Sequence, residues 1–228
     1  MALTDKCPSA NRVGTFVFEG LATIIGRRSF REIALFLAFA LLCLGIAAIA
    51  AVLLYPIDTL EIGPVENGWY ESAQTVVLGL TTLIVLRLLV ISWHEIFYFS
   101  AGLAMLLPLA MVRETPRCGS HYYDGGACLT EDGKVLTVSI AIAVVIAILA
   151  IRRVPVAKAW RELTFFYAVP AAFSVSMLIG SEIFGKLVYV WAEETLEFAA
   201  YLNLLGLAVA VSIWPKWFIA ASDEHSGD

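Results

Sequence analysis

Charged residues are scarce in this chain. Only 15% of its 228 residues are Asp, Glu, Lys or Arg, whereas about a quarter of the residues in soluble domains are charged. The formal net charge is −5 and no basic stripe is present, which excludes a nucleic-acid-binding protein. Apolar residues make up 60% of the chain and fall in runs about as long as a bilayer is thick. The composition therefore excludes an ordinary water-soluble core and predicts a protein that crosses a membrane several times.

Signatures of catalysis and of cofactor binding are also missing. The chain has three histidines, which argues against haem held by paired histidines within the membrane. It contains no H-E-x-x-H zinc motif, G-x-S-x-G elbow, Walker loop or dinucleotide-binding fingerprint. The sequence thus indicates neither a cofactor nor a particular metal, and it leaves open whether the protein is an enzyme.

Six apolar runs are long enough to form spanning helices, each of which needs roughly 20 residues. The predicted helices cover residues 33–55, 72–91, 96–113, 136–151, 162–180 and 196–214. Pro170 is expected to kink the fifth helix, and the apolar stretch after Gly180 is interpreted as a short helix in the membrane surface. The predicted fold is an all-α polytopic membrane domain over residues 33–214 with short loops. It is flanked by polar segments at 1–32 and 215–228.

The positions of lysine and arginine predict the orientation of this domain, because basic loops face the cytoplasm. Most basic residues fall on one side: Arg12, Arg27, Arg28, Arg31, Arg87, Arg152, Arg153, Lys158, Arg161 and Lys216. The opposite side has only Arg113, Arg117, Lys134 and Lys186. Both termini are therefore predicted in the cytoplasm, and a bacterial inner (plasma) membrane is the expected location. Residues 13–25 form either an amphipathic helix on the inner membrane surface or a partly ordered tail.

Two of the four cysteines lie in the predicted outer connection between the third and fourth helices. Cys118 and Cys128 are flanked by Pro and Gly residues that allow the two sulfurs to meet. A disulfide there would stabilise the protein by about 2–3 kcal/mol. The alternative is a metal site formed with His121 and Asp124, but zinc thiolate pairs usually have closer C-x-x-C spacing. Cys43 is predicted to be a buried packing residue in the first helix.

Acidic residues gather at the predicted outer ends of helices that are distant in sequence. The candidate ligand-binding residues of this rim are Glu66, Glu71, Arg113, Glu114, Glu182, Glu193 and Glu197. Glu193 and Glu197 share a helix face, with Tyr201 one turn further into the membrane. Carboxylates in the first turn of a helix also complement the helix dipole without any further role. Glu197 is the hardest to explain in that way, because it lies within an apolar run.

Three functions fit these features. The favoured one is binding or transport of a cation or a polar head group at the acidic outer site. The second is an extracytoplasmic lipid-modifying enzyme, in which the carboxylates act as acid and base or hold a metal while Arg113 binds lipid phosphate. The third is a non-catalytic accessory subunit that packs against another protein in the membrane. The expected partners are membrane lipids, together with a membrane protein or a second copy of the chain, and not nucleic acid.

Overall fold

The structure is a computed structural model that describes residues 30–54, 69–92, 95–119, 128–153, 167–187 and 189–218. The long helices in this part of the chain are α2 (Phe30–Leu54), α3 (Trp69–Ile91), α4 (Glu95–Glu114), α5 (Glu131–Arg152), α7 (Ala168–Lys186) and α8 (Val190–Ile213). A short 3-10 turn, η2 (Pro215–Trp217), follows α8. Each of the six long helices has the length and apolar composition to span a membrane. The predicted all-α multi-pass architecture is therefore confirmed.

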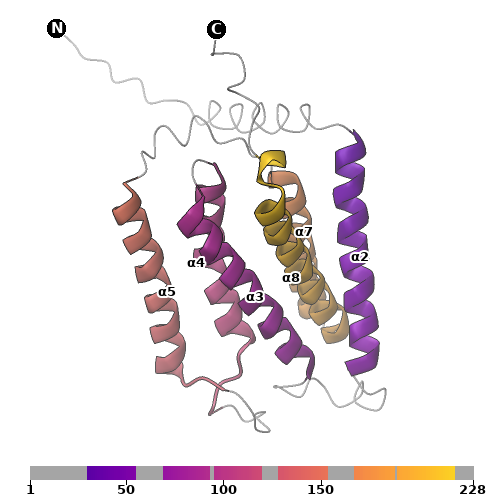
Figure 1. The fold of residues 1–228 in the computed structure, drawn as a ribbon. Coiled ribbons are helices and arrows are strands. Elements are labelled where there is room, and N and C mark those ends of the chain that lie inside the picture. Colours follow the sequence, from indigo (N-terminus) through magenta and orange to yellow (C-terminus); the bar gives the residue numbers. More distant parts are fainter. Residues whose placement is uncertain are drawn as a thin grey trace, which may run out of the picture.

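Successive helices run in opposite directions, so the first residue of α2 and the last of α8 lie at the same end of the bundle (Figure 1). The opposite end, lower in Figure 1, is where α4 finishes at Glu114 and α8 begins at Val190, and it is here called the carboxylate end. Its placement outside the cytoplasm stays a prediction, as does the location in a bacterial inner membrane.

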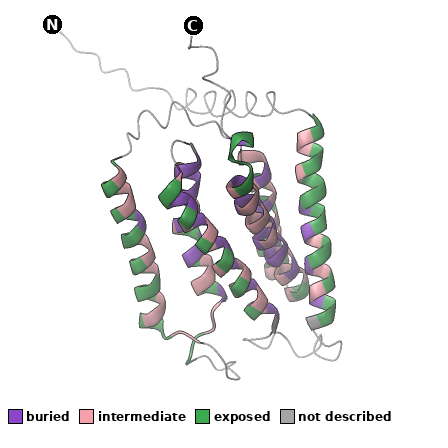
Figure 2. Ribbon diagram, in the orientation of Figure 1, coloured by how far each residue is buried: buried purple, intermediate pink, exposed green. Residues whose placement is uncertain are grey.

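The packing is organised around α8, which contacts α7, α2 and α3. Buried residues concentrate on α8 and on the inner faces of α3 and α4, whereas α5 and α2 at the two edges are largely exposed (Figure 2). Many exposed side chains of these edge helices are large and apolar, including Leu41 and Ile49 of α2 and Leu136 and Ile146 of α5, as expected of surfaces solvated by lipid. Small residues bring helices close together: Gly206 of α8 faces the ring of Phe39, and a Cβ at that position would lie 2.2 Å from Cζ of the ring.

Two predictions about the fifth crossing are wrong. Pro170 does not kink this helix, because α7 begins at Ala168 and the proline lies in its first turn, where no helical hydrogen bond is lost. The stretch after Gly180 is not a separate surface helix either, since α7 continues to Lys186 and α8 begins at Val190. Gly180 serves close packing instead: a Cβ there would lie 3.3 Å from Leu196 of α8.

The predicted disulfide between Cys118 and Cys128 is confirmed. Backbone hydrogen bonds accompany it, from Cys118 N to Leu129 O (3.2 Å) and from Leu129 N to Pro116 O (2.9 Å). Thr130 then caps α5 by accepting a hydrogen bond from Gly133 N, so α5 starts at Glu131, earlier than predicted. The end of α4 and the start of α5 are thus fastened together. Cys43 is buried as predicted, whereas residues 13–25, Cys7, Glu66, His121 and Asp124 lie outside the described residues.

Candidate functional site

Arg113 and Glu197 form the central ion pair at the carboxylate end. Arg113, in the last turn of α4, donates from Nη2 to Glu197 Oε1 of α8 at 2.7 Å. Its Nη1 lies 3.4 Å from Glu182 Oε1 of α7, so one guanidinium joins three helices. Only 2% of the Glu197 side chain is exposed, and the Ser181 hydroxyl oxygen lies 3.3 Å from the same Oε1. The free-energy cost of burying the Glu197 carboxylate is therefore offset by the charge of Arg113 and by the contact with the Ser181 hydroxyl.

Glu114, the neighbour of Arg113, meets α8 one turn deeper in the bundle. Tyr201 donates its hydroxyl hydrogen to Glu114 Oε1 at 2.8 Å. The glutamate is 9% exposed and the tyrosine 2%. This contact holds the Glu114 carboxylate beside that of Glu197.

Glu194 is the third carboxylate, and a side chain of α3 holds it in place. Gln74 donates from Nε2 to Glu194 Oε2 at 2.9 Å and also contacts the Glu194 backbone carbonyl at 3.2 Å. The glutamine is fully buried, yet its Oε1 finds no hydrogen-bond partner among the described residues. A buried carbonyl without a partner costs about 1–3 kcal/mol.

Glu114, Glu194 and Glu197 together form a three-carboxylate cluster. Each offers an oxygen, and these oxygens all lie within 4.8 Å of one another. Each carboxylate also has one oxygen held by a protein group: Tyr201 for Glu114, Gln74 for Glu194, and Arg113 for Glu197. At an effective dielectric constant of about 20, two charges 4.8 Å apart repel by roughly 3–4 kcal/mol. One guanidinium offsets only part of this repulsion, and either a proton or a bound cation can relieve the rest.

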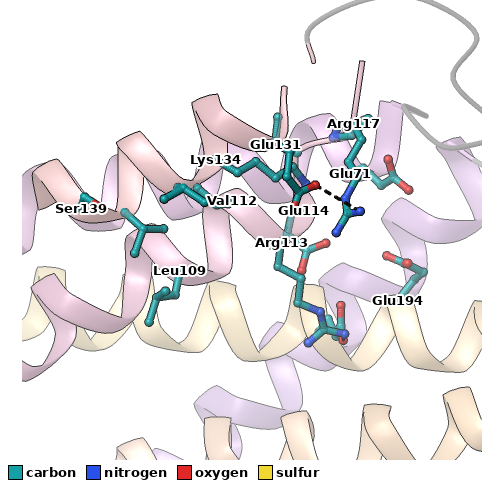
Figure 3. A pocket seen from close by; sticks show the side chains of 15 residues that line it. Glu71, Leu109, Val112, Arg113, Glu114, Arg117, Glu131, Lys134, Ser139 and Glu194 are labelled. Atoms are coloured by element: carbon teal, nitrogen blue, oxygen red, sulfur yellow. Dashed lines mark hydrogen bonds and ion pairs between the residues drawn. The ribbon is translucent and has the colours of Figure 1, made fainter. Parts of the chain in front are cut away.

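A cavity of about 730 Å³ lies beside the cluster, between α4 and α5. Its lining residues are Glu71, Leu109, Val112, Arg113, Glu114, Thr115, Pro116, Arg117, Glu131, Lys134, Val135, Val138, Ser139, Glu194 and Glu197. Figure 3 shows the carboxylates of Glu71 and Glu194 at one side of this space and Leu109 and Ser139 at the other. The cavity is therefore acidic near the cluster, and its wall away from the cluster includes the apolar residues Leu109, Val112, Val135 and Val138.

The chain matches no protein-family model, no curated protein and no solved structure.

The structure brings together some of the seven predicted site residues and separates others. Arg113, Glu114 and Glu197 meet at the cluster, Glu182 touches its edge through Arg113, and Glu71 lines the cavity. The Glu193 carboxylate lies against α7, where a Cβ at Gly185 would be 2.6 Å from its oxygens, and it is not one of the three clustered carboxylates. Glu66 lies outside the described residues.

Sequence reasoning did not include Glu194 among the candidate ligands, nor Gln74 and Tyr201 as the donors that hold the carboxylates. A signal was nevertheless present, since Glu194, Glu197 and Tyr201 follow one another at spacings of three and four and so share one helix face. Glu193 satisfies the same spacing rule with Glu197. Only the positions of α3 and α7 decide which of the two neighbouring glutamates faces the cluster.

Proposed function

We propose that this integral membrane protein binds a divalent metal cation through Glu114, Glu194 and Glu197 at the carboxylate end of its bundle. The observation that carries the proposal is the convergence of three carboxylates from α4 and α8 within 4.8 Å, each with an oxygen held in place by a protein group. Buried Gln74, whose Nε2 holds Glu194, also carries a carbonyl oxygen without a hydrogen-bond partner among the described residues. With the predicted orientation, the site faces the outside of a bacterial inner membrane.

The donor set favours a hard cation. Carboxylate and amide oxygens are the ligands of Ca²⁺ and Mg²⁺, whereas zinc sites are usually built with Cys or His. Calcium ligands lie at about 2.3–2.6 Å, so three oxygens evenly spaced around one ion are about 4.0–4.5 Å apart, close to the 4.8 Å limit of the cluster. Magnesium, with ligands at about 2.1 Å, needs oxygens within about 4.2 Å and hence a tighter cluster. Calcium is therefore the expected ligand.

Binding is preferred to transport because of the polar groups deeper in the bundle. Asn203 donates from Nδ2 to the Pro170 carbonyl at 3.0 Å and to Ser174 Oγ at 2.8 Å, and Ser174 in turn contacts the Ala200 carbonyl at 3.2 Å. These buried groups are used in packing α7 against α8. Neither of these two side chains is a carboxylate, so they do not continue the cluster toward the other end of the bundle.

The test is calcium binding to the full chain in detergent, measured by isothermal titration calorimetry after treatment with EDTA. We expect saturable binding to the wild type and its loss in Glu194→Gln. Glu193→Gln is the matched comparison, because it removes the same charge from the adjacent residue, which lies against α7 outside the cluster, and it should weaken binding far less than Glu194→Gln. Thermal unfolding gives an independent readout, since ligand at 100 times its Kd stabilises the fold by about 2.7 kcal/mol. Equal binding by Glu194→Gln and wild type, or no binding by either, would show the proposal to be wrong.

A further inference from the structure

The cavity between α4 and α5 has a basic side as well as an acidic one. Lys134, in the first turn of α5, lines the cavity and has no ion-pair partner among the described residues. Arg117 also lines it, with its Nη1 3.2 Å from Glu131 Oε2. The side chains of that pair are 63% and 66% exposed, and exposed pairs contribute little, so Arg117 can exchange its partner at small cost.

The rest of the cavity wall is apolar and continues onto the outer surface of the bundle. Leu109 and Val112 of α4 face the same space as Val135 and Val138 of α5. Leu109 is 45% exposed and Val135 is 62% exposed, and both belong to helices that span the membrane. An apolar chain seated between α4 and α5 can therefore continue along these residues into the surrounding lipid.

We propose that this cavity binds a membrane lipid with a phosphate-bearing head group. Its phosphate contacts Lys134 and Arg117, and its chains lie along Leu109, Val112, Val135 and Val138. Arg113 is not the phosphate ligand, because Glu197 and Glu182 already occupy its guanidinium. The volume of about 730 Å³ lies in the usual range of about 300–1,000 Å³ for small-molecule sites.

The lipid site rests on the proposed cation site through charge. Glu71, Glu114, Glu131, Glu194 and Glu197 line the cavity and outnumber its three basic residues, so a phosphate entering alone meets net repulsion. A divalent cation on the three-carboxylate cluster offsets this repulsion and presents a positive centre to the phosphate oxygens. Calcium and lipid should therefore strengthen each other's binding, because coupling between two sites is reciprocal.

The test compares short-chain phosphatidylglycerol, diacylglycerol and glycerol phosphate as probes for the full chain in detergent, with calcium or with EDTA. We expect phosphatidylglycerol with calcium to bind at least about tenfold more tightly than either fragment or than the EDTA sample. The double variant Lys134→Gln, Arg117→Gln should lose at least about tenfold in affinity for phosphatidylglycerol. Lys186→Gln is the matched control, because it removes a charge at the same end from an exposed residue outside the cavity lining, and it should bind as the wild type does.

Calcium binding without lipid separates the two proposals. If calcium binds alone but phosphatidylglycerol binding is unchanged by the double variant or by EDTA, only the lipid site is overturned. If no calcium binds, the cation site fails and the bridging role fails with it. Val138→Trp adds a test that leaves the charges in place. Because the indole fills the apolar part of the cavity, it should weaken phosphatidylglycerol binding and leave the calcium titration unchanged.

Discussion

Tyr201 of α8 donates a 2.8 Å hydrogen bond to Glu114 of α4, 87 residues away in the sequence. The contact joins two helices at the level of the cluster and occupies only one of the two carboxylate oxygens. Partners of this kind orient a metal ligand without touching the ion, and removing them typically lowers metal affinity by about 10- to 100-fold.

Tyr201→Phe should therefore weaken calcium binding by about tenfold or more while the protein stays folded, because only the hydroxyl is lost. Calorimetric titration with calcium measures the effect. Tyr189→Phe removes the same atom from a residue that is 63% exposed, and it should leave the affinity unchanged. Equal affinities for the two variants would mean that the Tyr201 hydroxyl does not orient Glu114.

Removing Arg113 should destabilise the fold, because it strands the charge of Glu197, which is only 2% exposed. We expect Arg113→Gln to lower the free energy of unfolding by about 1–3 kcal/mol. This loss is smaller than the about 3–5 kcal/mol typical of breaking a fully buried ion pair, because half of the arginine side chain is exposed. Adding Glu197→Gln to this variant should recover much of the lost free energy of unfolding. Arg117→Gln breaks the exposed pair with Glu131 and should change stability by less than about 1 kcal/mol. Chemical unfolding in detergent measures all four proteins, and a loss for Arg117→Gln as large as that for Arg113→Gln would contradict the expectation.

Gly206→Ala should loosen the packing of α2 on α8. The new methyl would lie 2.2 Å from the Phe39 ring, and overpacking of this kind costs about 1–3 kcal/mol. Gly102→Ala is the control, because nothing lies within 4 Å of a Cβ at that helical position. That substitution should be neutral or stabilising by up to about 1 kcal/mol, since alanine favours the helix. The melting temperatures of the two variants should therefore move in opposite directions or differ by several degrees.

The predicted orientation is tested with membrane-impermeant thiol reagents on intact cells. After mild reduction, Cys118 and Cys128 should be labelled and Cys7 should not, because the disulfide is expected outside and the N-terminal segment inside. The variant lacking Cys118 and Cys128 serves as the control and should take up no label. Labelling of Cys7 alone would show that the bundle has the opposite orientation, with the carboxylate end in the cytoplasm.

The class of fold, the number of crossings and the disulfide were predictable because simple constraints govern them. A bilayer sets the minimum length of an apolar helix, and two cysteines in a short glycine-containing loop have few other uses. The division between α7 and α8 was not predictable from composition. Apolar residues continue on both sides of Leu187, so the sequence shows no break there. Gly180 resembles a helix breaker in the sequence, but in the structure it lies within α7 and allows close packing against Leu196.

The candidate site was predictable at the level of charge but not of individual ligands. The predicted sixth helix started at residue 196, and the spacing rule placed Glu193 on one face with Glu197 but gave no such place to Glu194. In α8, which begins at Val190, neighbouring side chains point about 100° apart. Glu193 therefore faces Gly185 of α7, while Glu194 reaches Gln74 of α3. Sequence patterns carry no information about such neighbours.

The link between residues 118 and 128 also gives the molecule a maturation step. Glu114 belongs to the cluster and stands four positions before the first of these cysteines, and the second precedes α5 by only a few residues. Insertion of the helices into the bilayer can be complete before the thiols meet an oxidant. Cells that cannot oxidise the thiols would then contain the inserted protein in full amount, but without the covalent link between the end of α4 and the start of α5. With the orientation and the cation site proposed above, the redox state of the surrounding compartment, and not only the rate of synthesis, would set how much of the protein carries the closed loop beside that site.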